Sequence, residues 1–313
     1  LVGHLMEFWF RVFHRRWSGA GDSWSGLPVR DREFLDRALA DRTKRGAHAL
    51  TQISGRLAYL DQADSVWCRQ QLLPLRDWAA PSMAEPFWWG VLSYATWNPG
   101  LVADGLLEGL VETTDHLDAF RIDQRHRWAG LLASIAVRCE IASADAWVSE
   151  FTARAAVADR ERWIDELARE LSALDELGRT AVWDNWLGAF WAARTRNDPV
   201  VLEQTEMDRF ASIAPSAPAG ELETAVQLLE STAASFSSHA HASRFVNDDL
   251  ITARPELIGR FYKHLINNTD PQGFYGHHEL RPKLQRLVAT HGDWDELMAA
   301  ALRLQIDLTK PKG

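Results

Sequence analysis

Apolar side chains recur at three- and four-residue steps along almost the whole chain, and this spacing limits the possible folds more than any other feature of the sequence. Near the N-terminus the series runs through Leu5, Trp9, Val12, Phe13 and Trp17. Alternating runs of Val, Ile, Thr and Tyr, which are typical of half-buried strands, are almost absent. The sequence therefore predicts an all-α protein.

The predicted helices are roughly 12 to 20 residues long and follow one another through short turns, which is typical of stacked helix pairs. Two of them are predicted to start at Asn98-Pro99 and at Asp198-Pro199, where a capping residue precedes a proline. We therefore expect an array of antiparallel helix pairs, α-solenoid-like with irregular repeats, because no fixed repeat period can be recognised. This array is predicted to be one extended helical domain over residues 1–313. A soft boundary is expected near 214–220, where the sequence reads APSAPAG and predicts a linker.

The start of the chain and its cysteines indicate its cellular context. The chain begins at Leu1 without an initiator methionine, and HLMEFWFRVFHRRW already has helical spacing. We therefore expect a fragment, the C-terminal part of a longer protein. No signal-peptide pattern is recognisable. Two cysteines, Cys68 and Cys139, form no disulfide framework and fit a reducing compartment, so a cytoplasmic location is expected.

The charge of the chain bears on its partners. The formal net charge is -9, which argues against nucleic-acid binding, since that function needs a basic face. Residues 1–60 differ from the rest, with ten Lys and Arg against six Asp and Glu. No apolar run reaches the roughly 18 residues of a transmembrane helix. Neither nucleic acid nor a membrane is therefore expected as a partner.

The stretch GAGDSWSGLPVRD at residues 19–31 is similar to the glycine-rich loop that opens sirtuin-type NAD-binding domains. A phosphate-binding loop must follow a strand and open a helix, whereas residues 5–17 have helical spacing. Asp22 would also place a carboxylate near the diphosphate. We therefore interpret the stretch as a turn between helices, with Trp24 and Leu27 packed into the core.

Histidine pairs are the candidates for metal ligands. They are His239 with His241, which have Asp248 and Asp249 nearby, and His277 with His278. No further ligand stands at a recognisable zinc spacing from either pair. No Gly-x-Ser-x-Gly elbow or Walker loop is present either. We therefore predict no catalytic, cofactor-binding or metal site and keep a helical metalloenzyme as a less favoured alternative.

The helix predicted over residues 179–196 carries a concentrated aromatic face. At 100° per residue its large side chains fall within an arc of about 140°. This face consists of Trp183, Trp186, Phe190, Trp191 and Arg194. It is interpreted either as a core helix, with the arginine stem along the rings and its head reaching solvent, or as a partner-binding surface, where Trp and Arg are favoured.

Five stretches taken in order resemble the helical C-terminal region of bacterial sirtuin-like, defence-associated NAD hydrolases. They are HLMEFWFRVF, WSGLP, LAYLDQADSVWCRQQLLPLRDW, FWWGVLSYATWNPGLVADGLL and WDNWLGAFWAARTRNDPVVLEQTEMDRF. The resemblance covers about residues 1–290 and includes no catalytic motif. It departs at Glu85-Pro86-Phe87, where the family has a small residue.

The resemblance implies that the chain is the non-catalytic half of its parent protein. An upstream sirtuin-like domain would bind and hydrolyse NAD during phage infection, so this chain itself would have no cofactor. The helical part would sense, restrain or assemble, with the sirtuin-like domain and a phage protein as partners and a homo-oligomer as the expected state. The alternative is a generic helical protein-interaction scaffold.

Overall fold

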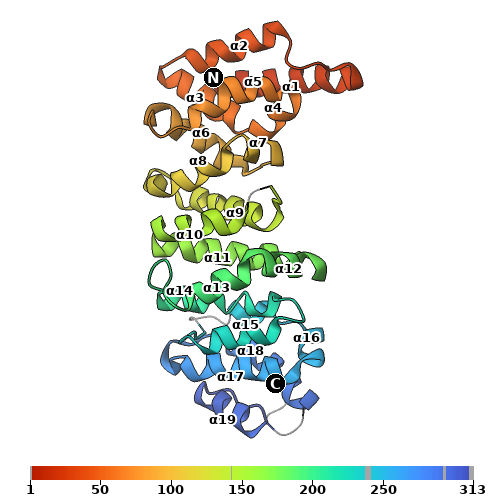
Figure 1. Cartoon of the computed structure of the whole chain (residues 1–313), viewed down its shortest axis with the longest axis vertical. Helices are drawn as coiled ribbons and strands as arrows, with labels where there is room; N and C mark the ends of the chain where they lie inside the picture. Colours follow the sequence, from red (N-terminus) through yellow and green to blue (C-terminus); the bar gives the residue numbers. More distant parts are fainter. Residues whose placement is uncertain (1, 142, 237–240, 292–293, 310–313) are drawn as a thin grey trace. The chain divides into compact units, whose positions relative to one another are not determined.

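The computed structural model describes residues 2–141, 143–236, 241–291 and 294–309 (Figure 1). The prediction of an all-α fold is confirmed, since these residues contain helices and no β-strand. The chain divides into two compact units, Leu1–Ser143 and Ala144–Gly313. The continuous array of antiparallel helix pairs stays a prediction.

The described residues of the first unit contain nine α-helices, which are joined by short turns, 3₁₀-helical segments and one π-helical segment. The α-helices are α1 (Val2–Ala20), α2 (Val29–Ala40), α3 (Lys44–Ser54), α4 (Leu57–Ala63), α5 (Ser65–Trp67), α6 (Pro81–Tyr94), α7 (Pro99–Ala103), α8 (Leu106–Glu112) and α9 (Ile122–Arg138). Between them lie η1 (Gly21–Ser23), η2 (Cys68–Leu72), η3 (Leu73–Arg76) and η4 (Thr113–Ala119).

The second unit is built in the same way. Its α-helices are α10 (Ala144–Arg154), α11 (Val157–Ser172), α12 (Glu176–Val182), α13 (Gly188–Arg194), α14 (Gln204–Phe210), α15 (Leu222–Glu230), α16 (Asp248–Ala253), α17 (Pro255–Asn268), α18 (His277–His291) and α19 (Asp295–Arg303). Shorter helical turns are η5 (Trp183–Leu187), η6 (Ala214–Ser216), η7 (His241–Phe245) and η8 (Pro271–Gly273).

The glycine-rich stretch at 19–31 is a turn between helices, as predicted. It leaves α1 through η1 and enters α2 at Val29. Gly26 has a φ of +108°, and a Cβ there would lie 3.0 Å from Oδ2 of Asp64. That carboxylate accepts hydrogen bonds from the backbone N–H of Leu27, at 3.0 Å, and from Arg32, at 2.9 Å. A glycine is therefore needed for the backbone to approach Asp64 with a left-handed turn.

The two side chains expected to anchor this turn do so in different ways. Leu27 is buried in the core. Trp24 is only half-buried, and its indole N–H donates to the carbonyl of Ala63 at 2.8 Å. The turn is thus held to the junction between α4 and α5 by the polar contacts of Trp24, Leu27 and Arg32, and Leu27 adds an apolar one.

The prediction of a linker at 214–220 is wrong. Residues 211–218 are buried, and η6 (Ala214–Ser216) is part of the core of the second unit. The backbone N–H of Ala219 also donates to a carboxylate oxygen of Glu176 at 2.6 Å. Small residues and prolines here permit close packing of an irregular segment, which composition alone does not distinguish from an exposed linker.

The prediction that a helix starts at Asp198-Pro199 is also wrong, since α14 begins at Gln204. The carbonyls of Asp198, Val200 and Val201 instead accept hydrogen bonds from the Arg194 guanidinium. Carbonyls that point at one side chain cannot all point along a helix axis. The matching prediction at Asn98-Pro99 is confirmed: the Asn98 side chain accepts from the Leu101 N–H and caps α7.

Close contact between α3 and α6 organises the first unit. A Cβ added to Gly90 would lie 2.0 Å from the Ser54 hydroxyl oxygen and 2.3 Å from the Thr51 carbonyl oxygen. A Cβ on Gly55 would lie 2.9 Å from the ring of Tyr94. The two helices therefore approach through glycine, and this approach brings the end of α6 beside the start of α4.

Gly90→Ala is expected to lower the free energy of unfolding by about 1–3 kcal/mol or more, because the added methyl overlaps backbone and side-chain atoms that must move. Gly19→Ala is the matched control, since a Cβ there meets nothing within 4 Å. It should be neutral or stabilise by up to about 1 kcal/mol. Urea denaturation of both variants measures the difference, and equal effects would contradict the close α3–α6 contact.

Candidate functional site

The predicted aromatic face is part of the core of the second unit. Its five side chains have exposed fractions of 6% for Trp183, 4% for Trp186, 8% for Phe190, 0% for Trp191 and 1% for Arg194. They lie on η5 and α13 and pack against α11 and α14. Trp191 stacks on Phe210 with ring centroids 5.4 Å apart, and Phe190 meets Trp163 edge-on at 5.8 Å. These side chains are therefore not an exposed surface of this unit.

The prediction that the head of Arg194 reaches solvent at the end of this face is wrong. Arg194 is enclosed, and one of its terminal nitrogens lies 3.2 Å from a carboxylate oxygen of Glu206. Burial lowers the pKa of Arg194, and Glu206 acts in the opposite direction. A charge this deep in a protein needs a counter-ion and hydrogen-bond acceptors, which here come from α14 and the irregular segment before it.

A second arginine completes a buried ionic cluster with Arg194 and Glu206. Arg160 on α11 donates to both carboxylate oxygens of Glu206 at 2.8 Å and to the carbonyl of Ala155 at 2.6 Å. The guanidinium groups of Arg160 and Arg194 therefore donate to Glu206 and to backbone carbonyls of the protein itself. The cluster therefore joins α11, α13 and α14, and it is best understood as a structural element of the second unit.

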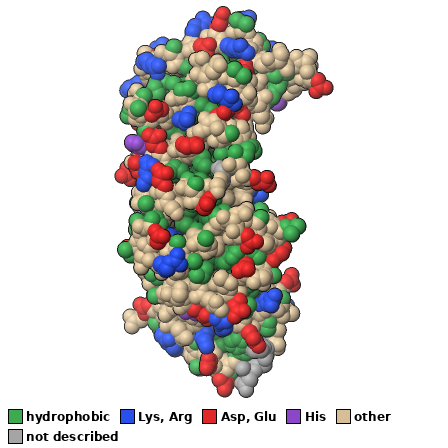
Figure 2. All heavy atoms as spheres, viewed as in Figure 1, with side chains coloured by type: hydrophobic (Ala, Val, Ile, Leu, Met, Phe, Trp, Pro, Cys, Tyr) green, Lys and Arg blue, Asp and Glu red, His purple; other side chains and the backbone are tan. Residues whose placement is uncertain are grey.

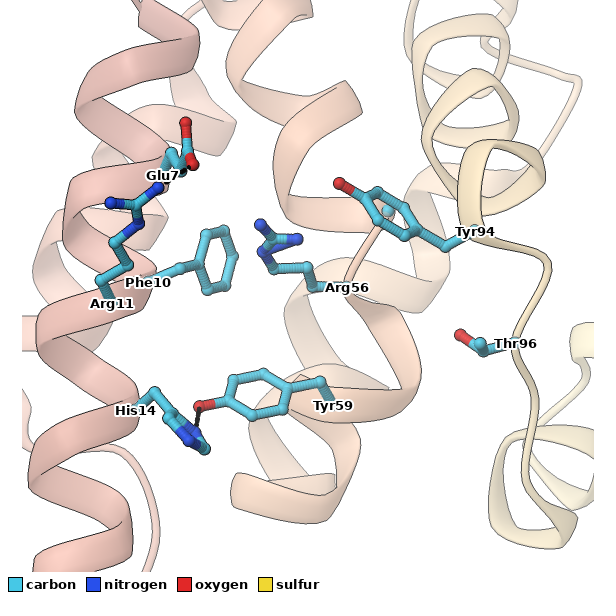
Figure 3. Close-up of a pocket in the computed structure, with 9 residues that line it drawn as sticks. Glu7, Phe10, Arg11, His14, Arg56, Tyr59, Tyr94 and Thr96 are labelled. Atoms are coloured by element: carbon cyan, nitrogen blue, oxygen red, sulfur yellow. Dashed lines mark hydrogen bonds and ion pairs between the residues drawn. The ribbon is translucent and has the colours of Figure 1, made fainter.

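A different group of charged and aromatic residues lines an open cavity of the first unit. This cavity, here named the Arg56 pocket, lies between α1, the α3–α4 junction and the end of α6 and has a volume of about 440 Å³ (Figure 3). Its lining residues are Glu7, Phe10, Arg11, His14, Gly55, Arg56, Tyr59, Tyr94 and Thr96.

Arg56 occupies the middle of the pocket, as Figure 3 shows. Its guanidinium carbon lies 4.6 Å from the ring centroid of Phe10 and 5.3 Å from that of Tyr94. Stacking on two rings holds a guanidinium in place without using its N–H donors. Within the part of the chain that the structure describes, no carboxylate pairs with Arg56 and no acceptor takes a hydrogen bond from it.

Local sequence explains how Arg56 reaches this place. Gly55 ends α3 and leaves room for the Tyr94 ring, and Arg56 is the residue directly before α4. Tyr94 is the last residue of α6, where Ala95 takes a left-handed conformation and ends the helix. The two helix ends therefore place the cation and one ring side by side, and Phe10 of α1 supplies the other ring.

The rim of the pocket is polar. Nδ1 of His14 lies 3.2 Å from the hydroxyl oxygen of Tyr59, and burial raises the pKa of that phenol. Glu7 pairs with Arg11 at 2.5 Å across one turn of α1. Glu7 thereby compensates Arg11, and the charge of Arg56 stays without a partner. The arrangement suits a ligand that brings a negative charge and a hydrogen-bond acceptor.

Two other cavities are less suited to binding a negatively charged ligand. One of about 460 Å³ lies on the other side of α1. It is lined by three arginines, but the buried Asp31, which pairs with Arg16 at 2.9 Å, already places a carboxylate in it. One of about 380 Å³ in the second unit is bordered by Ser235 and Asp270. Acidic and basic side chains are interspersed on the face shown in Figure 2, so surface charge alone does not single out a site.

The histidines considered as metal ligands do not form a cluster among the described residues. No group of three or more His, Cys, Asp or Glu side chains there could hold a metal ion. His277 packs its ring against Phe274, and Asp248 pairs with Arg286 at 2.9 Å. The His239 half of the other pair lies outside the described residues.

Sequence reasoning missed the Arg56 pocket. The excess of basic residues in 1–60 was a signal, but it did not distinguish Arg56 from nine other cations of that segment. Fold and site together define an all-α protein with a cationic, aromatic-lined pocket. No known family model matches the chain, and a search of curated proteins finds no significant similarity. In the described residues, every helix is too short or too polar to span a bilayer.

Proposed function

We propose that this chain is a non-catalytic regulatory domain and that the Arg56 pocket is its recognition site. One observation carries the proposal, namely a half-buried guanidinium held between two rings with its N–H donors unused. An arginine without a counter-ion in a concave, partly apolar site is typical of ligand recognition. The buried Arg160–Glu206–Arg194 cluster contrasts with it, since its donors are taken by the protein.

We also propose the biological setting that the resemblance implies. The chain would be the sensor or oligomerisation part of a cytoplasmic, sirtuin-like NAD hydrolase that acts against phage, with NAD bound by the catalytic domain. Occupation of the Arg56 pocket would then change how this domain restrains or assembles the hydrolase. The support for this part is the resemblance of five stretches in order, from HLMEFWFRVF to WDNWLGAFWAARTRNDPVVLEQTEMDRF.

This proposal predicts that the purified chain alone does not consume NAD, whereas the product of the whole reading frame that encodes it does. Both are compared at equal concentration by following NAD loss, with a phage-infected culture as the source of the trigger. Hydrolysis by the chain alone would show that it is an enzyme. A reading frame without a sirtuin-like domain would instead favour the generic helical scaffold.

A further inference from the structure

We infer that the Arg56 pocket binds a small organic anion with a planar apolar body and a single carboxylate or phosphoryl head. The inference rests on that part of the proposed function which makes the pocket a recognition site. It does not depend on an association with a sirtuin-like hydrolase. The head would be recognised by Arg56 and the body by the rings around it.

The anionic head follows from the charges of the pocket. Arg56 has five N–H donors in a planar fork that matches carboxylate and phosphoryl oxygens. Glu7 is turned to Arg11, at 2.5 Å, so the pocket brings no anion of its own to Arg56. The His14–Tyr59 pair adds a polar contact on the other wall, at the position where the two side chains face one another in Figure 3.

The planar apolar body of the ligand is inferred from the aromatic walls of the Arg56 pocket. Phe10 is buried with one ring face toward Arg56, and Tyr94 is half-exposed at the mouth on the α6 side. Phe10 and Tyr59 meet edge-on at 6.4 Å, so the α1 side of the pocket is aromatic as well. Aromatic walls favour a flat apolar group over a hydrated inorganic ion.

The size of the pocket limits the ligand. A volume of about 440 Å³ lies in the lower half of the roughly 300–1,000 Å³ that small-molecule sites occupy. It corresponds to roughly fifteen water molecules at about 30 Å³ each. A single-ring or two-ring compound fits this space, whereas a folded macromolecule would not enter it.

The chain has four tyrosines, and this permits a direct test by fluorine NMR of the 3-fluorotyrosine-labelled protein. Tyr59 and Tyr94 line the pocket, whereas Tyr262 is buried and Tyr275 is exposed in the second unit. Phenyl phosphate and benzoate are titrated separately, with benzyl alcohol as the uncharged probe and inorganic phosphate as the probe without a ring. Each resonance is assigned by the corresponding Tyr→Phe variant.

We expect phenyl phosphate or benzoate to shift the Tyr59 and Tyr94 resonances saturably and to leave those of Tyr262 and Tyr275 in place. Whichever of the two binds more tightly identifies the head as phosphoryl or carboxylate. Benzyl alcohol and inorganic phosphate should each bind at least roughly tenfold more weakly, since each lacks one half of the recognised chemistry.

Arg56→Gln should weaken the binding of whichever charged probe binds more tightly by roughly tenfold to a hundredfold, the usual effect of losing a hydrogen-bonded charge. Arg15→Gln is the matched control, because Arg15 is exposed on the same helix as Phe10 and does not line the pocket. A far-UV circular dichroism spectrum and a urea-denaturation midpoint equal to those of the wild type show that Arg56→Gln is folded. If it is not folded, Arg56→Lys serves instead, with intermediate binding expected because the charge stays and the planar fork is lost.

Several results would overturn the inference. Equal binding of benzyl alcohol would show that charge has no role, and equal binding of inorganic phosphate would show that the rings have none. An equal loss in Arg15→Gln would indicate unspecific attraction, and the absence of saturable shifts with either charged probe would remove the site. Because no NAD is measured here, these outcomes are separate from failure of the regulatory proposal.

Discussion

Replacement of Glu206 by glutamine is expected to lower the free energy of unfolding by about 3–5 kcal/mol, the usual cost of removing one partner from a buried ionic cluster. Glutamine keeps the shape of the side chain but leaves the guanidinium groups of Arg160 and Arg194 without a negative charge. Both arginines are more than nine-tenths buried, so water cannot replace the lost interaction. Urea or thermal denaturation of the variant measures the effect.

The matched control for this prediction is Glu150→Gln in the same unit. Glu150 pairs with Arg154 across one helical turn, and its side chain is 59% exposed. Exposed pairs of this kind contribute only about 0.3–0.5 kcal/mol, so the control should be close to wild type. A cost below about 1 kcal/mol for Glu206→Gln would contradict the buried cluster.

A triple replacement tests the physical explanation further. Arg160→Met, Arg194→Met and Glu206→Leu together remove all the charges and replace them by apolar side chains. Apolar replacement of a whole buried cluster is often neutral or stabilising by about 1–4 kcal/mol. Here some of that gain is offset, because backbone carbonyls before α14 lose the donors of Arg194. The triple variant should nevertheless be more stable than Glu206→Gln alone.

Trp191→Ala is expected to destabilise the second unit by about 3–5 kcal/mol, the usual cost of truncating a fully buried tryptophan. Its ring is 0% exposed and lies between Trp183, at 6.0 Å, and Phe210, at 5.4 Å. The cavity left behind is bordered by rigid rings that cannot easily collapse into it. The loss should appear as a lower midpoint of urea denaturation.

Leu177→Ala is the control for that truncation, since Leu177 in the same unit is 81% exposed. Substitutions at such exposed positions usually change stability by less than about 0.5 kcal/mol. A Trp191→Ala variant as stable as Leu177→Ala would revive the interpretation of the aromatic face as a binding surface. Binding assays on that variant would then be the next measurement.

Several features were predictable from the sequence because they depend on residues close together in the chain. Helical spacing of apolar residues predicted the all-α class, and the Asn98-Pro99 pair predicted the start of α7. The turn at 19–31 was also recognisable, because the preceding residues have helical rather than strand spacing. In each case the backbone conformation follows from local sterics and hydrogen bonds.

The environment of Arg194 was not predictable in this way. Its counter-ion Glu206 lies across an irregular segment, and Arg160 lies on an earlier helix. The sequence alone placed Arg194 correctly on the aromatic arc but suggested that its head reaches solvent. Only the packing of α14 against α11 brings the carboxylate to both guanidinium groups and removes water from them.

By itself the sequence determined that this chain forms helices and where some of them begin, because these properties depend on periodicity and capping within a few turns. It also located the aromatic face of residues 183–194 but left open whether that face is core or a binding surface. The Arg56 pocket was decided by tertiary structure alone. Phe10, Arg56 and Tyr94 belong to three separated segments, and only the packing of α1 and of α6 on α3 brings them together. Whether an arginine finds a carboxylate, as Arg194 does, or stays unpaired between two rings, as Arg56 does, depends on which distant helices pack beside it.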